Sequence, residues 1–327
     1  QYYVIEGTNL GSATTVSFNG VPVYFNRAFV TDHSIVVSIP TTVQTLPPAA
    51  NDTLSVVTLH GVVNYKFTVI TPPPTVDNWS DYDFWSGSQI TLTGVGFASV
   101  TSVALAGTTD APSIVSQSDK QLVLQFPATT VNRTSLIFSY SSAGSTVVLP
   151  STQELIDLDN AYTIFYNNNF QNSWIDNSWT HPSGVSTDLT HSTPGNSSLV
   201  ATYPAGGWQI EGWAGWNGPD GGFQYDASYK YLTFWVKGGI ADHTLVLVGD
   251  QMTGGYGQVQ LTAALPIQKI LVPKGVWTYY KIPLGTGSTQ LNFWANGSLA
   301  KQLGFFLQGQ DGDVNEVMYF DEVAFVK

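Results

Sequence analysis

Cysteine is absent from this sequence of 327 residues, and basic residues are few. Without cysteine the chain cannot form disulfide scaffolds, zinc fingers or iron–sulfur clusters, and it has no catalytic thiol. Lys and Arg number 11 against 23 Asp and Glu, which gives a formal net charge of −12. Nucleic acids and anionic membrane surfaces recruit Lys and Arg, so neither is an expected partner. No apolar run reaches the roughly 18 residues of a membrane-spanning helix, and we expect no membrane-spanning segment.

The apolar runs that are present are short and alternate with polar residues. Gly, Pro, Asn or Asp interrupts them about every 8–12 residues, which is the rhythm of antiparallel sheets. Asn19-Gly20 lies between the apolar runs Val16–Phe18 and Val21–Val23, and this pattern predicts a hairpin with a tight turn. Further strands are expected at Ser198–Tyr203, Tyr231–Lys237, Thr244–Val248, Trp277–Ile282, Gly304–Gln308 and Met318–Val326. The sequence therefore predicts an all-β protein.

Two breaks in this pattern predict three domains. Pro72-Pro73-Pro74 cannot continue a sheet, because proline lacks the backbone donor. The pattern lapses again near Pro150–Asn160, where Thr152–Asn160 is expected to form a linker turn. The predicted domains cover residues 1–71, 75–150 and 160–327. The chain begins at Gln1 in a strand-like sequence, so we expect it to be a processed piece of a longer, exported chain.

The first two predicted domains repeat one another. Ile5–Leu10 followed by Thr15–Gly20 is matched by Leu92–Phe97 followed by Ser102–Gly107, and each repeat then runs through a strand that ends in proline. This pattern resembles the IPT/TIG subclass of immunoglobulin-like β-sandwich domains. The first repeat lacks an initial strand, so we expect it to be truncated at its N-terminus. Eight or more strands in the last 165 or so residues predict a larger jelly-roll β-sandwich.

Tryptophan is concentrated in the last predicted domain, which holds eight of the ten. An indole ring offers a flat, electron-rich face to the C–H-rich face of a sugar ring, and Asn, Gln and Asp provide partners for neutral hydroxyl groups. Glycines beside several of these aromatic residues would leave the ring faces open to a ligand. The candidate ligand-binding residues are Trp174, Trp179, Trp208, Trp213, Trp216, Trp294 and Tyr256.

Each of these residues has packing in the core as its alternative role. Alternation along residues 231–237 predicts that Leu232, Phe234 and Val236 face the core and that Trp235 faces outward unless a loop covers it. For Trp235 and Trp277, structural packing is the favoured interpretation.

Enzyme and metal signals are weak. A glycosidase needs two carboxylates across a cleft, and Glu211 with Asp220, Asp250 or Asp311 is the combination that could be imagined. Asp311-Gly312-Asp313 resembles half of a calcium loop without the following ligands, so a surface turn is the better interpretation. The pair Asp321-Glu322 leaves a structural cation open. His181 and His191 lack a metal-binding or catalytic context. We expect no cofactor, no metal site and no catalytic residue.

The whole arrangement resembles the surface glycan-binding proteins of the B type (SGBP-B) from polysaccharide utilisation systems of Bacteroidetes. The two repeats, the Pro72–Pro74 hinge, and the segments Gly195–Leu199, Leu232–Gly238 and Tyr319–Val323 carry the resemblance. It implies tandem immunoglobulin-like spacers, a C-terminal glycan-binding sandwich and no catalysis. It also implies an outer-membrane lipoprotein that faces outward beside a glycan transporter, with Trp174 and Trp208 as the first residues to match to the aromatic platform.

The leading hypothesis is therefore a non-catalytic, cell-surface protein that binds a neutral polysaccharide. The expected ligand is a β-glucan, which could be mixed-linkage glucan, xyloglucan or β-1,3-glucan. Two alternatives stay open: a glycoside hydrolase that uses Glu211 and an aspartate, and a protein-adhesion module that uses the immunoglobulin-like repeats.

Overall fold

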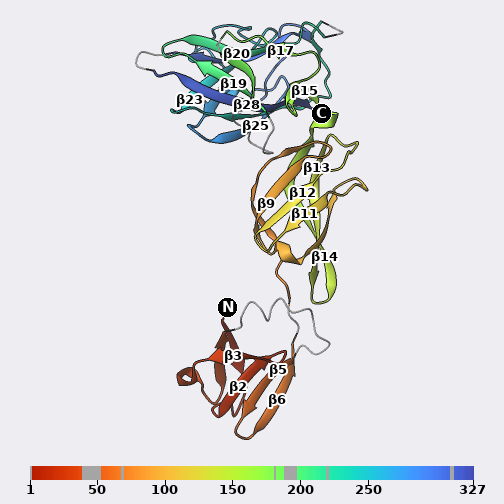
Figure 1. Ribbon diagram of the computed structural model, residues 1–327, viewed down its shortest axis with the longest axis vertical. Coiled ribbons are helices and arrows are strands. Elements are labelled where there is room, and N and C mark those ends of the chain that lie inside the picture. Colours follow the sequence, from red (N-terminus) through yellow and green to blue (C-terminus); the bar gives the residue numbers. More distant parts are fainter. Residues whose placement is uncertain are drawn as a thin grey trace.

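The computed structural model describes residues 2–38, 53–67, 70–179, 182–187, 197–218, 221–309 and 313–327. Across these ranges the chain is all-β, and four short 3-10 turns (η1–η4) are its only helical elements. None of these described helical elements is long and apolar enough to cross a membrane. The sheets form three groups along the long axis of the molecule (Figure 1). The predicted all-β fold is confirmed.

The first group, called the first unit here, is a six-stranded sheet with the order β1-β4-β3-β2-β5-β6. Val16, Ile35, Val37 and Val56 form its core, so its two halves pack against one another. The predicted hairpin is confirmed: Phe18 pairs with Val21, and the two turn residues between them have positive φ, as a type I′ turn requires. The strands are β1 (Tyr2–Glu6), β2 (Ala13–Phe18), β3 (Val21–Phe25), β4 (Ser34–Ser38), β5 (Thr53–Thr58) and β6 (Gly61–Lys66), and η1 is Arg27–Phe29.

The second group, the second unit, is a sandwich of two four-stranded sheets with the orders β10-β13-β14-β8 and β11-β12-β9-β7. Its pairings repeat those of the first unit: β9 pairs with β12 as β1 pairs with β4, and β10 pairs with β13 as β2 pairs with β5. The elements are β7 (Thr75–Trp79), β8 (Asp83–Phe84), β9 (Gln89–Val95), η2 (Phe97–Ser99), β10 (Val100–Leu105), β11 (Ser113–Gln117), β12 (Gln121–Gln125), β13 (Arg133–Ser142) and β14 (Ser145–Asp157).

The linker turn expected at Thr152–Asn160 is wrong. Strand β14 continues to Asp157, and the short 3-10 turn η3 (Leu158–Asn160) follows it directly. The polar residues around Glu154 hide an apolar pattern, because Leu155 is buried in the core of the second unit while Ile156 and Leu158 are buried against the next group of sheets.

The third group, the C-terminal sandwich, packs a seven-stranded sheet against a five-stranded sheet. The first contains β15, β16, β18, β19, β22, β25 and β28, and the second has the order β17-β20-β27-β23-β24. All six strands expected from the sequence in this region are present. The elements are β15 (Tyr162–Tyr166), β16 (Asn169–Phe170), β17 (Ile175–Asp176), β18 (Ser183–Ser186), β19 (Ser198–Tyr203), β20 (Trp208–Ala214), β21 (Phe223–Gln224), β22 (Tyr231–Lys237), β23 (His243–Gly249), η4 (Pro266–Gln268), β24 (Lys269–Val272), β25 (Trp277–Pro283), β26 (Leu299–Ala300), β27 (Gln302–Gln308) and β28 (Glu316–Val326).

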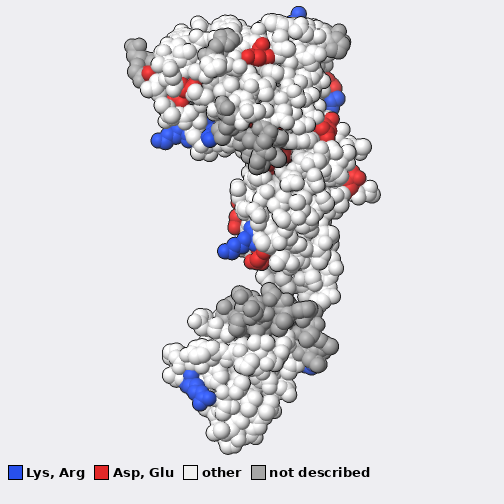
Figure 2. All heavy atoms as spheres, in the orientation of Figure 1, with Lys and Arg blue, Asp and Glu red and all other residues white. Residues whose placement is uncertain are grey.

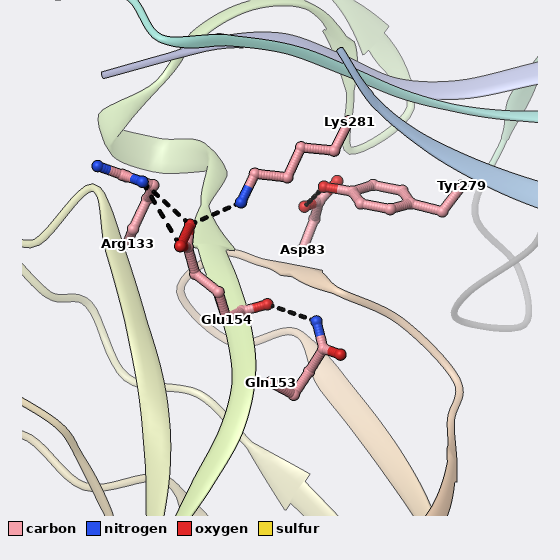
Figure 3. A network of polar contacts seen from close by, with 6 residues as sticks. All are labelled: Asp83, Arg133, Gln153, Glu154, Tyr279 and Lys281. Carbon is pink, nitrogen blue, oxygen red and sulfur yellow. Dashed lines mark hydrogen bonds and ion pairs between the residues drawn. The ribbon is translucent and has the colours of Figure 1, made fainter. Parts of the chain in front are cut away.

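The second unit packs directly on the outer face of the seven-stranded sheet. Lys281 Nζ lies 2.8 Å from Glu154 Oε1, and Arg133 Nη1 lies 3.3 Å from the same oxygen (Figure 3). Tyr279 donates a 2.8 Å hydrogen bond to Asp83 Oδ1. An apolar cluster lies beside these contacts and joins Trp85, Ile156 and Leu158 of the second unit to Ala324 and Val326 of β28.

This contact also determines the environment of Trp235. Leu232, Phe234 and Val236 face the core of the sandwich, as alternation predicts, and Trp235 faces outward. Tyr82 of the second unit stacks on the Trp235 ring at a centroid distance of 5.7 Å, which leaves Trp235 only 7% exposed. The packing interpretation of Trp235 is therefore confirmed, but the covering residue comes from another group of sheets.

Candidate functional site

The seven candidate residues lie in different environments. Trp174 is 1% exposed and Trp213 is 0% exposed, and both belong to the core of the C-terminal sandwich. The prediction that their rings are open to a ligand is wrong. Trp174 Nε1 donates to the Tyr162 hydroxyl and Trp213 Nε1 donates to Glu211, so the sandwich satisfies both indole N–H groups internally.

Strand β20 carries one buried candidate and one more accessible candidate, because it presents alternate residues to the two faces of the five-stranded sheet. Glu211 and Trp213 point inward. Trp208 and Ile210 lie on the outer face, where they pack in a second apolar cluster that includes Phe306 of β27. This outer face is where the accessible aromatic residues gather.

Three aromatic residues from separate segments meet there, and we call Trp179, Trp208 and Tyr256 the aromatic surface. Trp179 is 48% exposed, and its ring meets the Tyr256 ring edge-on at a centroid distance of 6.1 Å. The half-buried Trp208 packs edge-on against Phe306 at 6.0 Å. The structure thus brings together residues that are 77 positions apart in the chain (179 to 256).

Backbone contacts hold these rings in place. Trp179 N donates to Ile210 O at 2.9 Å, which extends the pairing of β17 with β20. The Tyr256 hydroxyl donates to Asn177 O at 3.4 Å. Trp208 Nε1 donates to Gly309 O at 3.0 Å, while Gln258 Nε2 donates to Trp208 O at 2.9 Å. The rings are positioned before any ligand arrives.

A glycine beneath Tyr256 makes its position possible. A Cβ atom built on Gly212 of β20 would lie 1.9 Å from the Tyr256 hydroxyl oxygen, and one on Gly304 of β27 would lie 3.0 Å from the Tyr256 ring. Tyr256 therefore lies directly over the two strands, where no side chain separates it from the sheet. Gly212 is one of the glycines that lie beside aromatic residues in the sequence. Its role in the structure is to leave room for the ring of Tyr256, which comes from another segment.

The remaining candidates lie elsewhere. Trp216 is 44% exposed and follows the end of β20 opposite to Trp208, and about 20 Å of strand separates those two ends. Trp294 is half-buried in a cluster with Phe223 and Phe293, and its Nε1 donates to Phe223 O at 3.2 Å. Trp294 therefore contributes to packing at the end of the sandwich.

Two residues that carry amides lie beside the aromatic surface. Asn177 and Gln258 flank it: the backbone O of Asn177 accepts from the Tyr256 hydroxyl, and the side-chain amide of Gln258 donates to Trp208 O. Sequence reasoning missed these two residues, because no local signal distinguishes them from the other amides of the chain. Charged side chains are sparse on the face of the molecule shown in Figure 2. The amide of Gln258 beside the aromatic surface is suited to hydrogen bonding with neutral hydroxyl groups.

Glu211 is the carboxylate on which the hydrolase alternative depends, and it is closed to solvent. It is 0% exposed and accepts hydrogen bonds from Ser178 Oγ at 2.8 Å and Trp213 Nε1 at 3.2 Å. Burial raises its pKa well above the ordinary carboxyl value, against the opposing effect of these hydrogen bonds. A group on the inner face of the sheet has no contact with a ligand on the outer face. The structure thus contradicts the catalytic role considered for Glu211.

The expected acidic partners of Glu211 offer no support either. Asp250 accepts hydrogen bonds from the backbone N–H groups of Lys301 and Gln302, both at 2.9 Å, which is a structural role in a turn. Asp220 and Asp311 lie outside the described residues, as do His181 and His191.

A group of three buried carboxylates lies at the contact between the second unit and the C-terminal sandwich. Asp81, Asp83 and Glu322 each offer an oxygen, and these oxygens lie within 4.8 Å of one another. Oxygen donors of this kind suit hard cations such as Ca²⁺ or Mg²⁺. The sequence leaves a structural cation open at Asp321 and Glu322, and Glu322 belongs to this group.

Known proteins are similar to parts or to the whole of this chain. No protein-family profile matches it. An IPT/TIG domain-containing protein of Bacteroides ovatus is 32% identical over 106 residues, which is 32% of this chain and 22% of that protein. The chain thus spans less than a quarter of this curated relative.

Several solved structures are similar over the full length of the chain. SGBP-B from a complex xyloglucan utilization locus of Bacteroides uniformis is 15% identical, with 95% of that chain covered and a TM-score of 0.44. The surface glycan-binding protein PbSGBP-B of Prevotella bryantii is 16% identical, with 92% covered and a TM-score of 0.43. SGBP-B of the Bacteroides ovatus mixed-linkage glucan utilization locus, in complex with a mixed-linkage heptasaccharide, is 12% identical, with 71% covered and a TM-score of 0.36. The names of all three contain SGBP-B.

Proposed function

We propose that this protein binds a neutral β-glucan without cleaving it, and that the ligand lies on the aromatic surface of the C-terminal sandwich. The observation that supports this most strongly is the meeting of Trp179, Trp208 and Tyr256 on the outer face of the five-stranded sheet, with the Trp179 ring half exposed. Three rings from separate segments converge on one outer face. The apolar ring of Trp179 stays in contact with water there unless a ligand covers it.

The chemistry of this surface favours a neutral sugar polymer. Each stacked ring contributes about 1 kcal/mol beyond the area it buries. The amides of Asn177 and Gln258 provide hydrogen bonds that orient the hydroxyl groups. The rings are held by backbone contacts in the free protein, so little conformational entropy is lost when the ligand binds. Trp216, which is 44% exposed beyond the C-terminal end of β20, is the further candidate for contact with a longer polymer.

The rest of the chain supports this role as a stalk. We propose domains at residues 1–71, 75–150 and 160–327, with the two smaller ones acting as immunoglobulin-like spacers. In this proposal, which follows the sequence resemblance to the SGBP-B type, the protein is held at the outer membrane by an N-terminal lipid. It then presents the captured glucan to a neighbouring transporter. Mixed-linkage glucan, xyloglucan and β-1,3-glucan are the ligands to compare.

The test is a set of affinity gels and titration calorimetry on these three polysaccharides with the full chain and its Trp179→Ala variant. We expect the variant to lose about fivefold or more in affinity, because one stacking contact of about 1 kcal/mol is removed. Tyr65→Ala is the matched control, since Tyr65 is 66% exposed on the first unit, and it should leave the affinity unchanged.

Two results would contradict the proposal. Equal affinity of the Trp179→Ala variant and the unsubstituted protein would remove the aromatic surface from the ligand site. Release of reducing ends from any of the three polysaccharides would show catalysis, and an intact polymer after prolonged incubation is the expected result.

A further inference from the structure

A cavity opens where the second unit meets the C-terminal sandwich, on the sheet opposite to the aromatic surface. Its volume is about 500 Å³. Residues of both groups of sheets line it: the second unit contributes Asn78, Trp79, Ser80 and Tyr82, and the sandwich contributes Trp235, Trp277 and Tyr279, together with Thr278. The cavity exists only because the two groups of sheets are joined, and neither could form it alone.

The aromatic side chains of this cavity are fixed in relation to one another. Tyr82 and Trp235 are stacked with an interplanar angle of 3°. Tyr279 lies 5.2 Å from the first ring and 5.1 Å from the second, and its hydroxyl donates to Asp83.

The ion pair of Lys281 with Glu154 lies nearby (Figure 3) and ties the two groups of sheets together on the same face. Burial by itself would raise the pKa of Glu154, but the hydrogen bond and charge of Lys281, with Arg133, hold it below the ordinary value. Glu154 is therefore charged at neutral pH, and the walls of the cavity are held in place without a ligand.

The lining has the chemistry of a sugar site. Aromatic rings make up most of it, and Asn78, Ser80 and Thr278 add uncharged polar groups. No Lys, Arg, Asp or Glu is among the described lining residues, and Asp83, which the lining residue Tyr279 contacts, is buried behind the lining. A volume of this size lies within the range of about 300–1,000 Å³ that is usual for small-ligand sites, and it can accept a short segment of a polysaccharide.

We propose that this cavity is a second saccharide-binding site and that it takes a short, neutral β-glucan segment. The choice of ligand class depends on the proposed function, whereas the location is independent of the aromatic surface. The second unit is then part of the binding machinery and not only a spacer. Two sites on one chain increase the overall affinity for a polymer that is long enough to reach both, without any new interaction at either site.

The experiment uses the full chain with 5-fluorotryptophan and ¹⁹F NMR, titrated with cellotetraose and with a xyloglucan heptasaccharide. Trp277 reports on the cavity and Trp208 on the aromatic surface, and each resonance is assigned by its loss in the corresponding Trp→Phe variant. We expect the Trp277 resonance to shift saturably with at least one of the two saccharides. The same dissociation constant should be measured for it in the Trp179→Ala variant, while the constant reported by Trp208 rises about fivefold or more.

Asn78→Arg is the blocking variant, because Asn78 is exposed at the rim of the cavity. It should reduce the affinity reported by Trp277 at least tenfold and leave the shift of Trp208 unchanged. Gln121→Arg introduces the same charge on the exposed side of β12 and should alter neither resonance.

The outcomes separate the two proposals. A Trp277 resonance that stays still at concentrations that saturate Trp208, or that shifts equally in the Asn78→Arg variant, overturns the second site alone. A shift at Trp277 without any at Trp208 supports the cavity and overturns the aromatic surface. If neither resonance moves with either saccharide, the ligand class is wrong and both proposals fail.

Discussion

At the scale of single residues, two pairs of tryptophans with similar sequence surroundings have opposite environments. Trp174 and Trp179 lie five residues apart in one polar stretch, yet the first is 1% and the second 48% exposed. Gly215 explains the burial of the first, because a Cβ atom at that position would lie 2.8 Å from the Trp174 ring. Trp213 and Trp216 are divided in the same way, at 0% and 44%.

The buried ring of Trp174 leads to a prediction about stability. We expect Trp174→Ala to lower the free energy of unfolding by about 3–5 kcal/mol, because it leaves a large cavity in the core. Urea denaturation followed by far-ultraviolet circular dichroism measures this change. The folded fraction should still bind β-glucan with unchanged affinity. A stable variant with lost affinity would restore Trp174 to the ligand site.

Glu211 leads to a prediction about pH. Burial raises its pKa in the folded protein well above the ordinary value of 4.5, so the native state keeps a proton that the unfolded state loses. Its stabilising contribution is complete below pH 4.5 and is lost as the pH rises through the raised pKa. The Glu211→Gln variant cannot ionise at this position. From pH 5 to 8, the unfolding free energy of the unsubstituted protein should therefore fall relative to that of the variant by up to about 1.4 kcal/mol per pH unit.

Denaturant titrations at several pH values measure this difference. Asp157, whose pKa burial raises to about 6, is present in both proteins, so its titration cancels in the comparison. Parallel pH profiles of the two proteins would show that Glu211 is ionised when folded. The affinity for β-glucan should be the same in both, since Glu211 is on the inner face of the sheet.

At the scale of elements, strand β20 and the segment that carries Tyr256 depend on one another. The outer face of β20 is bare at Gly212, and Tyr256 occupies the space that a side chain would take. Val259, Leu261 and Ala264 of the same segment pack beside it, in the cluster that Val246 and Phe306 complete. The aromatic surface is thus the product of one strand with a missing side chain and one long connection that lies over it.

This dependence predicts the effect of adding one methyl group at Gly212, which would collide with Tyr256. Gly212→Ala should displace Tyr256 and lower the affinity for β-glucan about fivefold or more, because the edge-on contact with Trp179 is lost. Gly257→Ala is the matched control: it lies in the same segment, and a Cβ atom there meets nothing within 4 Å. Calorimetric titration of both variants measures the difference. Equal affinities would mean that Tyr256 is not needed for binding.

At the scale of the whole molecule, the second unit and the C-terminal sandwich share an apolar core as well as the Lys281–Glu154 ion pair. Ile156 is 1% exposed at this contact, whereas Leu136 is 0% exposed in the core of the second unit. Two groups of sheets that bury apolar surface against one another stabilise one another, so each unfolds more easily when its neighbour has unfolded.

We therefore expect residues 75–327 of the full chain to unfold in one calorimetric transition. Ile156→Ala should separate this transition into two, because it weakens the contact between the two groups of sheets. Leu136→Ala removes a similar volume away from the contact, and it should lower the temperature of the shared transition without dividing it. Differential scanning calorimetry of the full chain measures both effects. Two transitions in the unsubstituted protein would contradict this coupling.

The sequence by itself determined the local features of this protein. The strands of the C-terminal sandwich, the type I′ hairpin turn after Phe18 and the inward orientation of Phe234 all follow from residue types and alternation, which act within a few positions of the chain. The concentration of tryptophan in the last part of a charge-poor chain was equally visible and pointed to neutral sugars.

Only the tertiary structure decided which of those tryptophans are accessible. Tyr82 covers Trp235 from a distance of 153 positions in the chain (82 to 235), and Tyr256 settles over Gly212 to meet Trp179. The burial of an outward-facing side chain depends on which distant segment packs over it. The residue pattern within the strand does not identify that segment. For the same reason the aromatic surface and the cavity at the contact of the two groups of sheets could not be assembled from sequence alone.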